Sequence, residues 1–284
     1  MPNIAMITDS DASLPAAVAE QYGIRQVPIT VNFGYEVLKT GIEIDDARLF
    51  ARVDKEGTLP TTSAPAPGDF STAYEQAFES GADTVLCFCV SSEISATYGA
   101  AVAARQTMPE RDIQVVDTLN LTMGQGYMVL AAAEAAKGGK PVPEILSIVD
   151  QIRARSQMYA VLPTLKYLAM SGRVGSLAAG FADVISIKPI LTVRDGKLDL
   201  LERVRTLKKA WKRAIELSSE AVGTNKVEQM SIVHVNAESE AKEFYNQLSQ
   251  VVSFSGEVLF AELTPGLSVH SGAGMVGVCF VVSE

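Results

Sequence analysis

The sequence predicts an α/β protein of two domains, an N-terminal domain built on a mainly parallel sheet and a C-terminal domain with a mixed or antiparallel sheet. The first half alternates short apolar runs with helical patterns, which is typical of parallel βα units. The second half is richer in strand-like runs, and the Asp195-Gly196 step between two of them indicates a hairpin. The 284 residues suit two compact domains of roughly 100–200 residues each. We place these domains at residues 1–157 and 158–284.

The first domain is expected to begin with a buried strand at Ile4–Ile7. A helix capped by Ser13 should follow and run to Gln21. The later elements expected in this half are an extended run at Gln26–Phe33, a helix from Asp45 to about Lys55, a helix from Asp69 to Gly81, a strand at Thr84–Val90, a helix at Ser95–Met108, a strand at Ile113–Asp117, and helices at Thr122–Lys137 and Pro143–Arg155. The run at Thr84–Val90 is apolar almost throughout and rich in β-branched residues, which favours a central strand covered on both faces.

The second domain is expected to contain more strands than helices. Its expected strands are Met158–Leu162, Lys188–Val193, Lys197–Arg203, Gln229–Val235, Gly256–Glu262 and Met275–Val282. Its expected helices are Thr206–Glu220 and Ser239–Gln250. Because the hairpin joins two adjacent strands, at least part of this sheet should be antiparallel.

Composition and charge exclude several classes of function. The net charge of −9 argues against a nucleic-acid partner, because such binding depends on Lys and Arg displacing counterions from phosphates. No run of about 18 uncharged apolar residues occurs and the N-terminus lacks a secretory pattern, so we expect a cytoplasmic protein. The three cysteines lie inside apolar runs and are expected to be buried structural thiols rather than disulfide or zinc ligands.

One basic cluster departs from the acidic average. It consists of Arg203, Arg205, Lys208, Lys209, Lys212 and Arg213. Such a run forms either a solvated helix face or a docking patch for an acidic partner. An interaction or regulatory protein that works through this cluster is therefore one hypothesis.

Hydroxyl-rich turns follow the ends of several expected strands or open expected helices. They are Thr8-Asp9-Ser10, Pro60-Thr61-Thr62-Ser63 and Ser91–Thr97, joined near the C-terminus by His270-Ser271-Gly272. In open α/β sheets, ligands gather beyond the carboxyl ends of the strands, so these turns are expected to form one anion site. No Gly-rich phosphate loop is present, and hydroxyl donors suit a carboxylate.

Two further residues are candidates for this site. His270 precedes a glycine-rich turn and could donate to a ligand there. Arg173 lies between Gly172 and Gly175, where it either meets a phosphate or faces water.

An enzymatic alternative is a small-molecule hydrolase or phosphotransferase that uses Asp9, Ser95 and His270. The sequence has no Gly-x-Ser-x-Gly elbow for a serine nucleophile. Asp9, Asp11 and Asp117 are candidates for paired-carboxylate chemistry, although nothing in the sequence fixes their spacing.

The ordered set of motifs resembles the DegV family of bacterial fatty-acid-binding proteins, which includes the acyl-carrying subunits of fatty acid kinase. The resemblance runs almost from end to end. Its motifs are Thr8-Asp9-Ser10, Thr61-Thr62-Ser63-Ala64-Pro65, Ser91–Tyr98, Val116-Asp117-Thr118, Ser171–Gly175, Arg203–Thr206 and His270–Gly274.

The resemblance implies a carrier rather than an enzyme, with one long-chain fatty acid buried between the domains and no cofactor. It implies that Thr62, Ser95 and His270 hold the carboxylate. Thr61, Ser63, Ser92, Thr97, Asp9 and Ser10 would support them.

The resemblance also implies a protein partner. Arg173 would contact a cytoplasmic fatty acid kinase or the phosphate, and the kinase would convert the bound acid to an acyl phosphate for phospholipid synthesis. Transient contact with a membrane surface is a further expectation.

Overall fold

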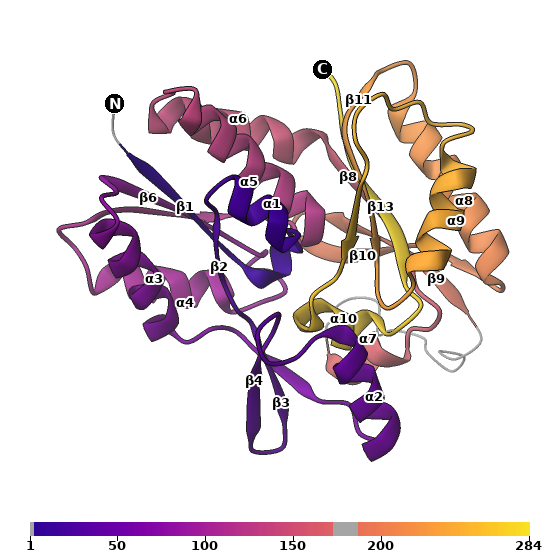
Figure 1. Cartoon of the computed structure of the whole chain (residues 1–284). Helices are drawn as coiled ribbons and strands as arrows, with labels where there is room; N and C mark the ends of the chain where they lie inside the picture. Colours follow the sequence, from indigo (N-terminus) through magenta and orange to yellow (C-terminus); the bar gives the residue numbers. More distant parts are fainter. Residues whose placement is uncertain (1–2, 173–186) are drawn as a thin grey trace.

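A four-stranded parallel sheet forms the centre of the N-terminal part of the protein (Figure 1). The computed structural model describes residues 3–172 and 187–284. The strand order is β2-β1-β6-β7, and the strands are β1 (Ile4–Asp9), β2 (Arg25–Val27), β6 (Thr84–Cys89) and β7 (Asp112–Asp117). Every residue of β6 is buried, which confirms the central strand expected from its apolar run.

Helices cover both faces of this sheet. The helices around this sheet are α1 (Ala16–Gln21), α3 (Pro67–Glu79), α4 (Thr97–Gln106), α5 (Thr122–Lys137) and α6 (Val142–Arg155). Helices α3 and α4 pack against one face through a core that includes Phe70, Tyr74 and Cys87. Helix α5 packs against β1 and β6 on the other face.

A small three-stranded antiparallel sheet was not expected from the sequence. Its order is β4-β3-β5, with β3 (Thr30–Phe33), β4 (Glu36–Lys39) and β5 (Thr61–Ser63), and its β3–β4 hairpin projects from the body of the protein (Figure 1). Helix α2 (Asp46–Glu56) follows β4, and Asp45 caps it as predicted by accepting from Arg48 N. The expected single run at Gln26–Phe33 is split between β2 and β3 because Pro28 lacks the N–H that a continuous strand requires.

The C-terminal part contains a six-stranded mixed sheet of order β10-β9-β8-β13-β11-β12. Its strands are β8 (Ser156–Val161), β9 (Lys188–Arg194), β10 (Lys197–Val204), β11 (Val227–His234), β12 (Leu259–Glu262) and β13 (Val276–Val282). Only β11 and β12 pair in parallel, and β9 and β10 form the antiparallel hairpin predicted at Asp195-Gly196. The predicted domain boundary after residue 157 falls inside β8, and the division into 1–157 and 158–284 stays a prediction.

Helices α8 (Leu207–Val222) and α9 (Glu238–Leu248) cover one face of the six-stranded sheet. Short helices η1 (Ser10–Ala12), α7 (Lys166–Ser171) and α10 (Pro265–Ser271) lie in connections. The basic cluster lies at the end of β10 and along α8, where Arg213 is already paired with Glu202, Glu216 and Glu220.

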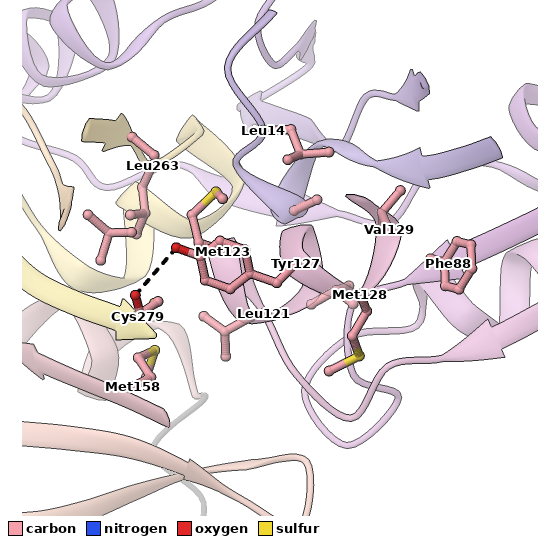
Figure 2. Close-up of a cluster of buried hydrophobic side chains, with 14 of the residues drawn as sticks. Leu14, Phe88, Leu121, Met123, Tyr127, Met128, Val129, Met158, Leu263 and Cys279 are labelled. Carbon is pink, nitrogen blue, oxygen red and sulfur yellow. Dashed lines mark hydrogen bonds between the residues drawn. The ribbon is translucent and has the colours of Figure 1, made fainter. Parts of the chain in front are cut away.

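Helix α5 fills the space between the two large sheets. Figure 2 shows Tyr127 of α5 directed toward Cys279 of the six-stranded sheet, with Phe88 of β6 toward the opposite end of the cluster. The Tyr127 hydroxyl donates to the Cys279 carbonyl at 3.5 Å, and both residues are buried. Burial on all sides explains why small and apolar residues dominate α5 instead of a single apolar stripe.

Three helix starts differ from the predictions for local reasons. Ser13 does not cap α1: it has a left-handed φ of 52°, and Pro15 restricts Leu14, so the helix begins at Ala16. Helix α3 begins at Pro67, and Asp69 is the third residue of its first turn, where its carboxylate accepts from Ala66 N. Ser95 precedes α4 and accepts from Thr97 N.

Among the helices that the structure describes, none is both long enough and apolar enough to cross a bilayer.

Candidate functional site

The candidate site is a cavity between the four-stranded and six-stranded sheets, with a volume of about 340 Å³. This volume lies within the range of pockets that enclose a small ligand. Most of its wall is apolar and comes from both halves of the chain, including Val90, Ile94, Leu121, Met158, Leu191, Leu198 and Val233. The cavity therefore suits a ligand with a substantial hydrocarbon part.

Alternation along β8 shows how the sheet forms one wall. Met158, Ala160 and, directly after the strand, Leu162 border the cavity. Tyr159 and Val161 point to the opposite face, where they join the core under α8 and α9. A single strand thus serves the cavity with one face and the C-terminal core with the other, as the two-residue period of a strand requires.

Polar side chains from two distant segments meet at the cavity. Thr62 is the middle residue of β5, and His270 lies in the last turn of α10. Their side chains are joined by a hydrogen bond of 3.0 Å between Thr62 Oγ1 and His270 Nε2, and both residues line the cavity. The structure therefore brings together two of the three residues predicted to hold a carboxylate.

The third predicted residue, Ser95, also lines the cavity. Its Oγ lies 2.8 Å from Thr97 Oγ1 and accepts from Thr97 N at 3.3 Å. Thr97 is fully buried, and its hydroxyl helps to fix the orientation of the Ser95 side chain. Because Ser95 Oγ accepts from the backbone, its own O–H can be directed at a ligand.

Asp9 and Ser10 are placed in the fold rather than on the cavity wall. The buried Asp9 carboxylate accepts from Val90 N, Asp11 N and Gln125 Nε2. Burial raises the pKa of Asp9 to about 6, although these donors counteract the increase. Ser10 bonds to Thr40 Oγ1 and accepts from Ile29 N. The structure therefore does not place Asp9 with Ser95 and His270 on the cavity wall, as the hydrolase alternative would require.

The other predicted supporting residues lie toward the surface. Thr61 and Ser92 are exposed and do not border the cavity, whereas the exposed Ser63 does and accepts from Asn32 Nδ2. Arg173 lies outside the described residues, so its role stays a prediction.

Asp11, which the sequence analysis considered only as a candidate for paired-carboxylate chemistry, borders the cavity. It is only 5% exposed, and Thr264 Oγ1 donates to its Oδ1 at 3.2 Å. Burial and the nearby Asp9 both raise the pKa of Asp11. The cavity therefore contains one buried carboxyl group besides its hydroxyls and imidazole.

A second buried carboxyl group supports α10 from outside the cavity. Asp46, at the start of α2, accepts from Ser268 Oγ at 2.7 Å, and burial raises its pKa to about 7. Ser268 lies two residues before His270, so this bond fixes the helix that presents the imidazole.

The β9–β10 hairpin contacts the segment just before Ser95. Ser91 Oγ donates to the Gly196 carbonyl at 2.7 Å, and Lys197 pairs with Glu93 at 3.1 Å. Gly196 has a φ of +77°, and a Cβ there would lie 2.6 Å from Ser91 Oγ, so glycine is required both for the turn and for this contact. The hairpin thus holds the segment that contains Ser95 against the C-terminal sheet.

Neither a metal cluster nor a disulfide is found in the described residues. No group of three or more His, Cys, Asp or Glu side chains in 3–172 and 187–284 has the geometry of a metal site. Cys87, Cys89 and Cys279 are all free and buried, as predicted.

Known proteins with similar sequences and structures extend over nearly all of this chain. The sequence pattern of the DegV family, described as uncharacterised proteins, matches residues 3–283. A DegV domain-containing protein of Streptomyces coelicolor is 34% identical over 276 residues, covering 97% of both chains. The protein DegV of Bacillus subtilis is 32% identical over 282 residues, covering 98% of this chain and 99% of the relative.

Solved structures agree with the sequence relatives. A fatty-acid-binding DegV-family protein of Thermus thermophilus superposes with a TM-score of 0.91 at 29% identity, over 100% of both chains. The fatty-acid-binding protein DegV of Bacillus subtilis superposes with a TM-score of 0.89 at 30% identity, again over 100% of both chains. The predicted α/β fold class is thereby confirmed, and this chain belongs to the DegV family.

Proposed function

We propose that this protein binds one long-chain fatty acid in the cavity between its two large sheets, as a carrier without a cofactor. The observation that supports this most strongly is the composition of the cavity wall, which is apolar over most of its area but includes the hydroxyls of Thr62 and Ser95 and the imidazole of His270. Related proteins of Thermus thermophilus and Bacillus subtilis bind fatty acids, which adds independent support.

The acyl chain would supply most of the binding free energy. Each buried methylene contributes about 0.8 kcal/mol, so a chain of about 15 methylenes offsets the cost of ordering a flexible ligand. Aliphatic side chains such as Leu121, Leu191 and Leu198 line the cavity, and such side chains can pack against a polymethylene chain.

The carboxylate would be held by donors without a fixed positive charge. If His270 Nε2 carries its proton, it donates to Thr62 Oγ1, and the Thr62 O–H is then free to donate to the ligand. Ser95 is oriented in the same way by Thr97. Two hydroxyl donors would thus replace the water that a buried carboxylate loses.

We further propose that the bound acid is presented to a cytoplasmic fatty acid kinase, which phosphorylates it to an acyl phosphate for phospholipid synthesis. Thr61, directly before Thr62, and Ser92, three residues before Ser95, are both exposed, so a partner could approach that end of the cavity. Arg173 would contact the kinase or the phosphate. Transient contact with a membrane surface would let the carrier exchange its ligand.

The proposal predicts that the protein purified from a bacterial host contains fatty acid. Denaturation without hydrolysis, followed by mass spectrometry of the organic extract, should give close to one equivalent of a long-chain acid. A protein denatured and refolded without lipid and then offered hexadecanoic acid is the control for incomplete loading in the host. An empty extract in both samples would contradict the proposal.

A further inference from the structure

The cavity contains a polar group that binding a plain fatty acid does not use. Asp11 borders the cavity beside Ile29 and Gly266. Its Oδ1 accepts from Thr264, but no donor to its Oδ2 exists among residues 3–172 and 187–284. Oδ2 keeps a small accessible surface, and Asp11 lies on the wall of the cavity. A ligand group at that place would meet a carboxyl oxygen.

Close packing fixes the position of Asp11. A Cβ atom on Gly266 would lie 2.3 Å from Asp11 Oδ1 and 3.0 Å from Ile29, so α10 approaches Asp11 as closely as a glycine permits. The Asp11 N–H is held by Asp9 Oδ1 at 2.9 Å. The carboxyl group therefore cannot turn away from the cavity without displacing its surroundings.

The position of Asp11 relative to the carboxylate site follows from α10. Gly266 and His270 are four residues apart, so they lie on the same face of the helix, about 6 Å apart along its axis. Asp11 touches the first and Thr62 bonds to the second. An acyl chain whose carboxylate is at Thr62 and His270, and which runs along α10 toward Gly266, would pass Asp11 within its first few carbons.

A plain methylene chain would bury Asp11 Oδ2 without a hydrogen bond, which disfavours binding. A hydroxyl group can both donate and accept, so it pairs with a carboxyl group in either protonation state. Resting on the proposed function, we infer that Asp11 selects fatty acids that carry a hydroxyl group close to the carboxylate, with 3-hydroxy acids as the class that fits this spacing.

The test compares three ligands on delipidated protein by titration calorimetry: hexadecanoic acid, 3-hydroxyhexadecanoic acid and 12-hydroxyoctadecanoic acid. Wild-type protein should bind the 3-hydroxy acid about tenfold more tightly than hexadecanoic acid, and the 12-hydroxy acid should show no such gain, because its hydroxyl lies far from Asp11. Equal affinities for hexadecanoic and 3-hydroxyhexadecanoic acid would overturn the inference.

Two variants identify the source of the preference. Asp11→Leu, of similar shape but apolar, should lose the preference and bind hexadecanoic acid more tightly than wild type, whereas Asp11→Asn should keep the preference. Thermal unfolding of both variants checks that they fold. If Asp11→Leu does not fold, Asp11→Asn alone tests the role of Asp11 in ligand preference. The role of Asp11 would be refuted if Asp11→Leu still preferred the 3-hydroxy acid. It would also be refuted if a folded Asp11→Asn protein lost that preference.

The outcomes for wild type separate this inference from the proposed function. If wild type binds none of the three acids, the proposed function itself fails. If it binds hexadecanoic acid and the 3-hydroxy acid equally well, only this inference is refuted.

Discussion

Replacing Thr62 with valine and Ser95 with alanine together is expected to weaken hexadecanoic acid binding by about 10²–10⁴-fold. Hydrogen bonds to a charged group contribute roughly 1.5–3 kcal/mol each, and the double variant removes two donors from the carboxylate site. Valine keeps the shape of threonine at Thr62, so the cavity wall stays intact. Titration calorimetry on delipidated protein measures the change.

The matched control is Ser63→Ala. Ser63 also borders the cavity and lies in the same strand as Thr62, but its hydroxyl bonds to Asn32. This variant should bind hexadecanoic acid within about twofold of wild type, because Ser63 is expected to support the carboxylate site without bonding to the carboxylate itself. A folded Thr62→Val/Ser95→Ala variant with undiminished affinity would contradict the assigned site.

Protein stability should fall as the pH rises from about 4 to about 7, and Asp46 should account for much of the fall. Burial raises the pKa of Asp46 to about 7 in the folded protein, whereas an unfolded aspartate titrates near 3.9. Between these values the folded state keeps a proton that the unfolded state has lost, so the free energy of unfolding decreases with pH. A shift of about three units corresponds to roughly 4 kcal/mol, present in full below pH 4 and lost above pH 7.

Asp46→Asn removes this titration while leaving an oxygen that accepts from Ser268. The variant should therefore show a flatter dependence of unfolding free energy on pH, measured by urea denaturation at several pH values, and higher stability than wild type at pH 8. Asp54→Asn, in an exposed position of the same helix, controls for the general loss of a carboxylate from α2. An Asp46→Asn protein that loses as much stability as wild type over this range would disprove the role of Asp46.

The elements predicted correctly from the sequence are those with strong local signals. The alanine-rich run gives α5 the predicted bounds, Thr122–Lys137, with Gly138 directly after it. The Asp195-Gly196 turn is as predicted because few other residue pairs adopt its positive φ values so readily. In these places local preference and tertiary packing agree.

The missed elements depend on packing between distant segments. Thr61–Ser63 is a strand only because it pairs with β3, roughly thirty residues earlier in the chain, and three residues give no periodic pattern. Helix α10 contains Gly266 and two serines, which are weak helix formers, and it is held by contacts with α2, α7 and β5. Pro265 at its first position was the one local signal for a helix.

Three residues of the candidate cavity could be named from the sequence, but their geometry could not, and their role as carboxylate ligands stays a prediction. The hydroxyl-rich turns and the family resemblance indicated Thr62, Ser95 and His270, and the structure places all three on one cavity. The sequence analysis favoured Asp9 over Asp11 as a site residue, yet Asp9 is buried in the fold and it is Asp11, in η1, that borders the cavity. Which of two neighbouring carboxylates faces a ligand depends on one short turn, and no sequence pattern reports its direction.

A crystal structure with hexadecanoic acid bound tests the central claim most directly. The account predicts the chain inside the cavity between the two large sheets, with a carboxylate oxygen within hydrogen-bond distance of Thr62 Oγ1 and of Ser95 Oγ. A chain bound elsewhere on the protein, or one lying in the cavity with its carboxylate away from Thr62 and Ser95, would contradict it.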